Sequence, residues 1–591
     1  MMKSMTLSLK TLEPYLAILV AALPVLVIGA TFGWGLNHST YLVEGIKIAH
    51  PEIWQNDWWV NETTHYHFLF SYLVYGLEKL AILKPALVVA NILVIFASFY
   101  LIYRIIREVY GPRALEIFVV FVLLFAIIHK TQSVAQTFFF IDSLQPSSFG
   151  ALGFLLGMFY FIRGRYFSSG LSVAILSLFH ANFLILAFPL FGLAHIFVRE
   201  KRLVKRLFWQ LGPLLLGFLF LLPSILSTVD LTAPKEVVDD ALNIIFKIRS
   251  PWHYDFSYFK GEFVFLFGWL LMGVGALYFS WKKNLILGRF SALFWAMVLI
   301  ILVAFMEGLW IKSDFMARLF IWRLAPFVLM FAMIIFISAV FEDRWPEKIS
   351  PTANRWFFAS FFMGSMAVIL VETSKLINLH GNYPLFFAYL PLVLIVFWFL
   401  NFFQSSLKKR PDSPSGKLKF SRGLLTYGLA SFMIPFQMTG LFDTCRFSYL
   451  ADNCHYAEES LYKNVRTITG NNSIFITPPN LVRFRLFTHR AVVASWDEVP
   501  FTPQETLEWY RRMSDIVGVE QISSWQEVNS FYQTQTVDNL IKLREKYGVD
   551  YAVFRNDSSF NPAVLETFGP PVYKNKVFFL FSLKKEQQTG E

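Results

Sequence analysis

Long, nearly uncharged apolar stretches recur along this chain and constrain its fold more than any other feature. One of them, 85–103, reads PALVVANILVIFASFYLIY. A helix of about 20 such residues crosses the hydrocarbon core of a bilayer. Of the 591 residues, 55% are hydrophobic and 16% are charged, which leaves too little polar surface for a soluble protein of this size. The sequence therefore predicts a polytopic α-helical membrane protein embedded in the lipid bilayer.

The apolar stretches predict about 13 spanning helices. No small-residue cleavage site closely follows the first stretch, so we expect a retained helix there and not a removed signal peptide. An odd number of spans places the two termini on opposite sides of the membrane. The predicted spans are 15–34, 85–103, 114–128, 148–162, 168–180, 183–198, 206–227, 262–280, 290–308, 321–341, 356–373, 384–402 and 423–441.

The basic residues orient these spans. With the N-terminus inside and the C-terminus outside, every Arg- and Lys-rich loop falls in the cytoplasm, as the positive-inside rule requires. The outer side then receives two long loops, 35–84 and 228–261, and everything after about 442. The basic loops are Arg104/Arg107/Arg113, Arg163/Arg165, Arg199 to Arg206, Lys282/Lys283/Arg289, Arg344/Lys348/Arg355 and Lys408 to Arg422.

The stretch 168–198 is long for one helix and short for two full crossings. A single helix would put the basic residues of 163–165 and 198–206 on opposite sides of the membrane. The charges therefore predict a short hairpin that turns at 179–183, FHANF, with its tip lining a cavity of the protein.

The composition changes after residue 441, which divides the chain into a transmembrane domain, 1–441, and an outer domain, 442–591. Alternating strand and helix signals in the outer domain predict an α/β fold with a small, mostly parallel sheet. Thr502 and Glu505 are spaced as a capping box at the start of a helix. The strand signals are 473–479, 490–496, 550–555 and 576–583, and the helix signals are 503–517 and 537–547.

The two cysteines of the chain, Cys445 and Cys454, lie just beyond the last predicted span. On the outer side they would share an oxidising compartment, which favours a disulfide between them over two free thiols. Two sulfurs alone make a poor metal site.

The net charge of +11 does not indicate nucleic-acid binding, because the basic residues lie mostly in short loops between apolar stretches. No nucleotide-binding, zinc-protease or serine-hydrolase motif is present. A membrane enzyme that uses a lipid-linked substrate needs a carboxylate base, cations to hold a phosphate, and a cavity at the outer leaflet.

Glu44 and Asp57 in the first outer loop are candidates for the base, and two Trp follow Asp57 directly. Tryptophan next to an acid would hold that acid at the depth of the lipid headgroups. The alternative is that both acids are solvated loop residues or helix caps.

Candidates for binding an anionic phosphate lie in the second outer loop and at the outer ends of the spans. Such a cationic and aromatic group can equally be an anchor at the membrane interface. His180, at the predicted hairpin tip, is either a ligand in a cavity or a hydrogen-bonded helix end. The remaining candidates are Arg249, His253, Tyr254, Arg318 and Arg323.

Taken together, several segments resemble a family of bacterial multi-spanning proteins that is similar to the GT-C superfamily of membrane glycosyltransferases. The resemblance covers most of the chain, and its motifs are loose. The segments are GLNHSTYLVEGI (35–46), PEIWQNDWW (51–59), DSLQPSSFGALGFLLGMFYFIRGRY (142–166), LSLFHANF (176–183), RSPWHYD (249–255), TPPNLVRFRLFTHRAVVASWDEVP (477–500) and LEWYRR (507–512).

The resemblance implies a GT-C-like fold in the bacterial inner membrane with a periplasmic C-terminal domain. It implies transfer of a sugar from a polyprenyl-phosphate or polyprenyl-diphosphate donor to a glycan, lipid or protein acceptor, with inversion at the anomeric carbon. By analogy, Asp57 or Glu44 would be the base, and Arg249 and His253 would bind the lipid phosphate. Because Glu44 and Asp57 are not an adjacent pair of acids, the identity of the base and any need for a divalent metal stay open.

Two other readings remain. A transporter or flippase would need helix-breaking residues in paired spans and acids buried at mid-membrane, whereas the charges here collect at the outer face. A non-enzymatic envelope assembly factor would use its outer domain only to dock a partner. Convergence of Asp57, Glu44, Arg249 and Arg323 on one outer cavity would favour the enzyme, and scattering of these residues would favour transport or scaffolding.

Overall fold

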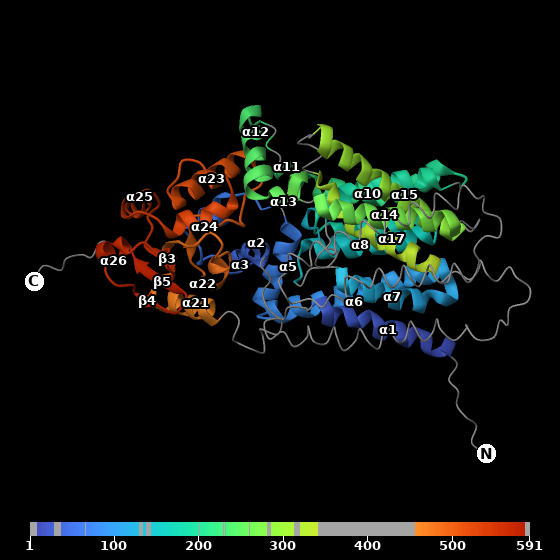
Figure 1. The fold of residues 1–591 in the computed structure, drawn as a ribbon, viewed down its shortest axis with the longest axis horizontal. Helices are drawn as coiled ribbons and strands as arrows, with labels where there is room; N and C mark the ends of the chain where they lie inside the picture. Colours follow the sequence, from blue (N-terminus) through green and yellow to red (C-terminus); the bar gives the residue numbers. More distant parts are fainter. Residues whose placement is uncertain are drawn as a thin grey trace, which may run out of the picture.

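The computed structural model consists of a helical bundle and an α/β domain, with the short helices of the first outer loop between them (Figure 1). The structure describes residues 9–28, 37–65, 67–128, 134–137, 143–198, 200–228, 230, 232–258, 260–280, 285–311, 319–340 and 456–584. The predicted spans 356–373, 384–402 and 423–441 lie outside the described residues, as do Arg318, Cys445 and Cys454.

The described part of each of the first ten predicted spans falls on a helix of the bundle. Within the described residues, four helical stretches are long and apolar enough to cross a membrane: Leu83–Phe125, Leu203–Thr228, Ile286–Trp310 and Ile321–Ala339. The bundle helices are α1 (Leu9–Ile28), α6 (Leu83–Tyr110), α7 (Ala114–Ile128), α8 (Pro146–Ile162), α9 (Tyr166–Ser177), α10 (Ala181–Phe197), α11 (Leu203–Thr228), α14 (Lys260–Ser280), α15 (Leu285–Met306) and α17 (Ala325–Val340).

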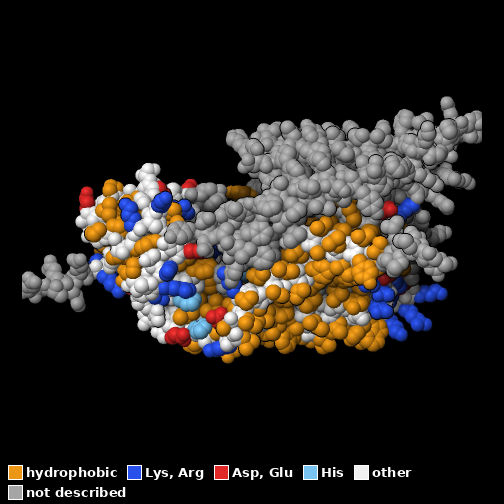
Figure 2. All heavy atoms as spheres, turned by 90° about the horizontal axis from the view of Figure 1, so that it is seen from below, with side chains coloured by type: hydrophobic (Ala, Val, Ile, Leu, Met, Phe, Trp, Pro, Cys, Tyr) orange, Lys and Arg blue, Asp and Glu red, His pale blue; other side chains and the backbone are white. Residues whose placement is uncertain are grey.

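The described bundle is apolar on the face that Figure 2 shows and along α11. Figure 2 shows a continuous hydrophobic face along it, in contrast to the mixed surface of the α/β domain. On α11, Leu216 is 71% exposed and Phe208 is 69% exposed. An apolar patch of this extent fits contact with lipid and not with water. The chain therefore has the build of a helical membrane protein.

The hairpin predicted within 168–198 is confirmed as two helices. α9 has 12 residues and α10 has 17, so they extend about 18 and 25 Å, less than the thickness of a bilayer core of about 30 Å. Between them the chain turns at 178–180. Asn182, in the first turn of α10, donates a hydrogen bond to the carbonyl of Leu319, so the hairpin tip reaches the start of the segment that leads into α17.

Where the structure describes them, the basic loops that the sequence assigns to the cytoplasm lie together at one end of the bundle. Arg289 donates to the Glu200 carboxylate at 2.6 Å and to the carbonyl of Ile162 at 3.2 Å, and Arg163 lies 3.4 Å from Glu108. Figure 2 shows Lys and Arg gathered at the end of the bundle opposite the α/β domain. The bundle thus has a basic end and an end that carries the α/β domain.

Short helices of the two long loops lie between the bundle and the α/β domain (Figure 1). In the second loop, a π-helical turn, η3, continues directly from α12 and places Arg249 at its last position. These elements are α2 (His38–Tyr41), α3 (Val43–Ala49), α4 (Trp58–Glu62), α5 (Phe68–Lys79), α12 (Lys235–Asn243), η3 (Ile244–Arg249) and α13 (Pro251–Tyr254).

The α/β domain contains a five-stranded sheet of order β2-β1-β3-β5-β4. β1 pairs in parallel with β2 and β3, whereas β5 pairs antiparallel with β3 and β4. The sheet is therefore mixed and not mostly parallel, because the last two strands form a hairpin and no helix crosses between them. The strands are β1 (Ile474–Ile476), β2 (Ala491–Val492), β3 (Tyr551–Arg555), β4 (Tyr573–Lys574) and β5 (Phe578–Ser582).

The helices of this domain begin and end where the sequence chemistry places them. The Thr502 hydroxyl accepts from the backbone N–H of Glu505 at 3.4 Å, and Glu505 reaches back to the N–H of Thr502, which confirms the capping box. Gly518 ends α23 in the left-handed conformation that favours glycine. The helices are α21 (Tyr456–Ile468), α22 (Phe484–Thr488), α23 (Pro503–Val517), α24 (Trp525–Gln533), α25 (Val537–Tyr547) and α26 (Ala563–Phe568).

The first outer loop shares a hydrophobic core with the α/β domain. Trp54, Trp58 and Trp59 of the loop belong to one buried cluster with Trp496 and Trp509 of the domain. The α/β domain described over 456–584 therefore packs as one body with part of 35–84, and the predicted boundary at residue 441 lies outside the described residues.

Candidate functional site

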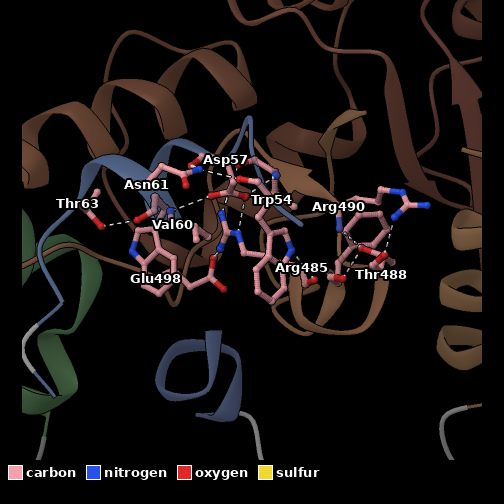
Figure 3. Close-up of polar contacts among 12 residues, drawn as sticks. Trp54, Asp57, Val60, Asn61, Thr63, Arg485, Thr488, Arg490 and Glu498 are labelled. Atoms are coloured by element: carbon pink, nitrogen blue, oxygen red, sulfur yellow. Dashed lines mark hydrogen bonds and ion pairs between the residues drawn. The ribbon is translucent and has the colours of Figure 1, made fainter. Parts of the chain in front are cut away.

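Asp57 anchors the first outer loop to the α/β domain. Its Oδ1 accepts from the backbone N–H of Val60, capping α4, and its Oδ2 accepts from Nε of Arg485 at 2.7 Å and from the N–H of Val492 at 2.9 Å (Figure 3). Only 1% of Asp57 is exposed. With both oxygens occupied and solvent excluded, Asp57 has the geometry of a cap and ion-pair partner and not of a base that meets an acceptor hydroxyl.

Arg485 is the centre of a buried charge cluster. Its Nη1 contacts the Glu498 carboxylate, and its guanidinium lies 5.1 Å from the centre of the Trp59 ring. Arg485 and Glu498 are each 1% exposed. Removing one member of such a buried set leaves an uncompensated charge and costs about 3–5 kcal/mol. The cluster therefore fixes the position of α4 on the domain.

Arg249 of the second outer loop also binds the α/β domain. Its Nε donates to the carbonyl of Trp496 at 2.8 Å, its Nη2 lies 3.2 Å from the Asp497 carboxylate, and its Nη1 donates to the Ser250 hydroxyl at 2.6 Å. Burial lowers the pKa of Arg249, and Asp497 opposes this shift. All three guanidinium nitrogens are engaged, so the geometry of Arg249 is that of a clamp between the second loop and 496–498.

Of the two candidate acids, Glu44 on α3 is the one that the fold leaves available. Its side chain is half-buried, and Oε2 lies 3.4 Å from Nδ1 of His65. Among the described residues, Oε2 of Glu44 and Nε2 of His65 have no hydrogen-bond partner. Burial raises the pKa of Glu44, and His65 opposes this shift. A carboxylate with a raised pKa is a stronger base near neutral pH than an ordinary glutamate.

A second group of polar side chains lies at the hairpin tip. The His67 ring is 5.1 Å from Tyr41 and 5.2 Å from His180, and His67 Nδ1 is 3.1 Å from the carbonyl of Phe179. His180 is 4% exposed, and neither of its ring nitrogens has a hydrogen-bond partner in the described part of the chain. The Arg323 guanidinium lies over Phe183, 5.7 Å from the ring centre.

The charge of Arg323 reaches this group. Burial lowers the pKa of His67 to about 3, and Arg323 contributes to the same shift. Burial raises the pKa of Tyr41, and Arg323 opposes that shift. At neutral pH His67 is therefore a neutral imidazole, and Arg323 supplies the positive charge.

His253 joins the second outer loop to the bundle. Its Nδ1 lies 2.7 Å from the carbonyl of Ala135, and its ring is 5.5 Å from Phe320, with Tyr254 5.6 Å from the same ring. Burial lowers the pKa of His253 to about 4. His253 and Tyr254 therefore lie beside Phe320, whose ring also faces Arg323 at 5.2 Å.

The glutamine before Pro146 ties the first outer loop to the bundle. Gln145 is the N-cap residue of α8, and its Oε1 accepts from the Asn37 side chain at 2.9 Å. His38 Nε2 lies 2.9 Å from the carbonyl of Leu144. These two contacts fix the start of α2 against the start of α8. They therefore also limit where Tyr41 and Glu44, which follow in the chain, can lie.

The four residues expected to converge do not form one cluster in the described structure. Asp57 and Arg249 hold the two outer loops on the α/β domain, Glu44 faces His65, and Arg323 faces the group at the hairpin tip. No group of three or more His, Asp or Glu within the described ranges is arranged to hold a metal ion. The role of a divalent metal stays open.

Sequence reasoning missed the α/β-domain residues that hold the first outer loop: Arg485, Glu498 and, through Thr64, Glu505. One signal was present. Arg485 interrupts the apolar run of α22, where a charged residue must be paired if it is buried. Its partner, Asp57, lies 428 residues away in sequence.

Residues 456–516 match a family described as a domain of unknown function, DUF6798. The matched segment contains Arg485, Glu498 and Glu505 and runs from α21 into α23. No curated protein matches the chain.

Proposed function

We propose that this protein is a membrane glycosyltransferase that takes a sugar from a polyprenyl-phosphate or polyprenyl-diphosphate donor at the end of the bundle that carries the α/β domain. The acceptor would be an envelope glycan, lipid or protein. The proposal extends the resemblance to the GT-C superfamily, with Glu44 as the base.

One observation carries this assignment. Glu44 combines a raised pKa with a buried carboxylate oxygen that no described donor satisfies, and it lies in an outer loop attached to the bundle. Of the two acids that the sequence offers, Asp57 has both oxygens committed to structural contacts. A base must also be reachable by the acceptor hydroxyl. The side chain of Glu44 is 31% exposed, whereas that of Asp57 is closed to solvent.

In the proposed reaction the acceptor hydroxyl gives its proton to Glu44 while its oxygen bonds to the anomeric carbon. The bond from that carbon to the donor phosphate breaks, and its electron pair leaves with the phosphate. The polyprenyl phosphate or diphosphate therefore gains negative charge, which Arg323 would stabilise. His180, with two unpartnered ring nitrogens among the described residues, and His253 would complete the binding of the phosphate oxygens.

The first test is sugar transfer by the purified protein in lipid vesicles over a panel of polyprenyl-phosphate sugars. Glu44→Gln should abolish turnover, because the amide cannot accept the proton. Glu62→Gln, a change at an exposed acid of the same loop, should leave turnover unchanged. In the wild type, turnover should fall with acidification at a pH above the usual range for glutamate, because the pKa of Glu44 is raised and the base must be ionised.

Two results would overturn this assignment. Full turnover by Glu44→Gln, together with loss of turnover by a folded Asp57→Asn protein, would move the base to Asp57. No turnover on any donor, with lipid-linked sugars carried across the bilayer or left in place, would favour a transporter or an assembly factor. Two observations favour the assembly factor: Asp57 and Arg249 are used in interdomain contacts, and the four residues expected to converge do not form one cluster in the described structure.

A further inference from the structure

We infer that Arg485 and Glu505 of the α/β domain are positioning residues for the pair formed by Glu44 and His65. This inference rests on the proposed role of Glu44 as the base. The inference gives the α/β domain a part in the reaction. The domain would not touch the substrate, but it would fix the position of His65 beside Glu44.

The first connection runs through Arg485. Its Nε binds Asp57, the residue that caps α4, and its guanidinium stacks over Trp59 in the same helix. The Trp59 ring in turn meets the His65 ring edge to face, with 4.7 Å between the ring centres. Arg485 therefore fixes both the start of α4 and the aromatic surface against which His65 lies (Figure 3 shows the start of this connection).

The second connection runs through Glu505. Its Oε1 accepts from both the backbone N–H and the hydroxyl of Thr64, at 3.0 and 2.9 Å. Thr64 is the residue before His65. On the other side of Thr64, the Thr63 hydroxyl donates to the carbonyl of Trp59 at 2.6 Å. The segment that presents His65 is thus held from both sides, by α4 and by the first turn of α23.

These connections matter because α4 is only five residues long and ends at Glu62. So short a helix has little stability of its own and depends on tertiary contacts. His65 lies 3.4 Å from the Glu44 carboxylate, at the outer limit of useful contact. A displacement of about 1 Å in such a site can reduce turnover by about 100-fold. The domain contacts supply the rigidity that the loop lacks.

Glu505→Ala in the full-length protein tests the inference. It removes the acceptor for Thr64 and also half of the α23 capping box. Thr502→Ala is the matched control, since it removes the other half of the capping box and leaves the contact between Glu505 and Thr64 in place. Glu505→Gln is the conservative variant, because its side-chain oxygen can still accept from Thr64.

Hydrogen exchange gives a readout that does not depend on activity. Glu505→Ala should speed exchange in the peptide that covers 58–67 relative to wild type, and Thr502→Ala and Glu505→Gln should not. Arg485→Lys should speed exchange in the same peptide, because lysine keeps the charge but loses Nε. Unchanged exchange in 58–67 for both Glu505→Ala and Arg485→Lys would overturn the inference.

Kinetics then separate a positioning role from a structural one. With an active donor, Glu505→Ala should lower kcat about 10- to 100-fold, with a smaller change in KM, and Glu505→Gln should restore most of it. The acidic limb of the pH profile should move to higher pH in Glu505→Ala, because His65 would no longer oppose the rise in the pKa of Glu44. An equal loss of kcat in Thr502→Ala would show that Glu505 acts only as a helix cap and would overturn the inference.

The proposed base can fail separately. If hydrogen exchange changes as expected but Glu44→Gln retains full turnover, Glu44 is not the base, although the contacts of Arg485 and Glu505 still hold the loop in place.

Discussion

Asp57 and Glu44 are chemically similar acids of one loop, but their surroundings suit Asp57 to a structural role and Glu44 to accepting a proton. Asp57 accepts three hydrogen bonds in a site closed to solvent, one of them from Arg485. Glu44 has a raised pKa, faces His65 and keeps a buried oxygen that no described donor satisfies. The surroundings of these carboxylates, and not their type, decide which one is suited to accept a proton.

Breaking the charge cluster around Asp57 should destabilise the α/β domain together with the part of loop 35–84 that packs on it. Asp57→Ala removes the cap of α4 and leaves Arg485 without one of its two buried acids, so we expect the free energy of unfolding to fall by about 3–5 kcal/mol. Asp57→Asn should cost less, because asparagine is also a good cap. Thermal unfolding in detergent measures both.

The control for this prediction is Asp557→Ala, at an exposed turn where the Asp557 carboxylate accepts from the N–H and hydroxyl of Ser559. It should change the unfolding temperature little. Equal stability of Asp57→Ala and Asp557→Ala would mean that the ion pair does not hold the loop on the domain.

At the scale of elements, the positions of basic residues predicted the number of helices in 168–198 better than the length of the apolar stretch did. The lengths of α9 and α10 alone favour neither one helix nor two, but the basic residues on both flanks require a turn, and the hairpin is confirmed. The directions of β4 and β5 could not be predicted from charge or from length. Whether β5 pairs parallel or antiparallel depends on the connection from β4, which a hydrophobic strand pattern does not reveal.

The crossing of α9 and α11 depends on a glycine. A Cβ atom on Gly170 would lie 2.1 Å from the carbonyl oxygen of Gln210 in the backbone of α11. Gly170→Ala should therefore push the two helices apart and lower stability by about 1–3 kcal/mol. Gly212→Ala on α11 meets no atom within 4 Å, so it should be neutral or stabilising.

The unfolding temperatures of the two glycine variants in the same detergent measure this difference. A Gly170→Ala protein as stable as Gly212→Ala would show that the helices can separate at no cost. Gly170 would then have no role in holding the hairpin against α11.

At the scale of the whole molecule, the basic end of the bundle and the α/β domain lie at opposite ends (Figure 2). We expect the basic end in the cytoplasm. In a chain with Cys445 and Cys454 replaced by Ser, a membrane-impermeant maleimide should label Glu520→Cys on intact spheroplasts. It should label Lys201→Cys only after permeabilisation, because both positions are exposed but lie at opposite ends. The reverse pattern would invert the topology.

Periodicity, caps and charge were enough to predict the ten described bundle helices, the hairpin and the start of α23. They could not predict the contacts between loop and domain, because those contacts join residues far apart in sequence. Arg485 and Glu505 carry no local sign that their partners are Asp57 and Thr64. The fold of the bundle was therefore largely accessible from the sequence, and the geometry of the candidate site was not.

The shared core of the first outer loop and the α/β domain also bears on biosynthesis. The ribosome makes Trp54 and Asp57 hundreds of residues before Arg485, so the loop is synthesised before the partners that cover it. Contacts so distant in sequence form late and slowly. A chain that stops before the α/β domain would carry an uncovered tryptophan surface, which makes the last domain the step that completes assembly of the first loop.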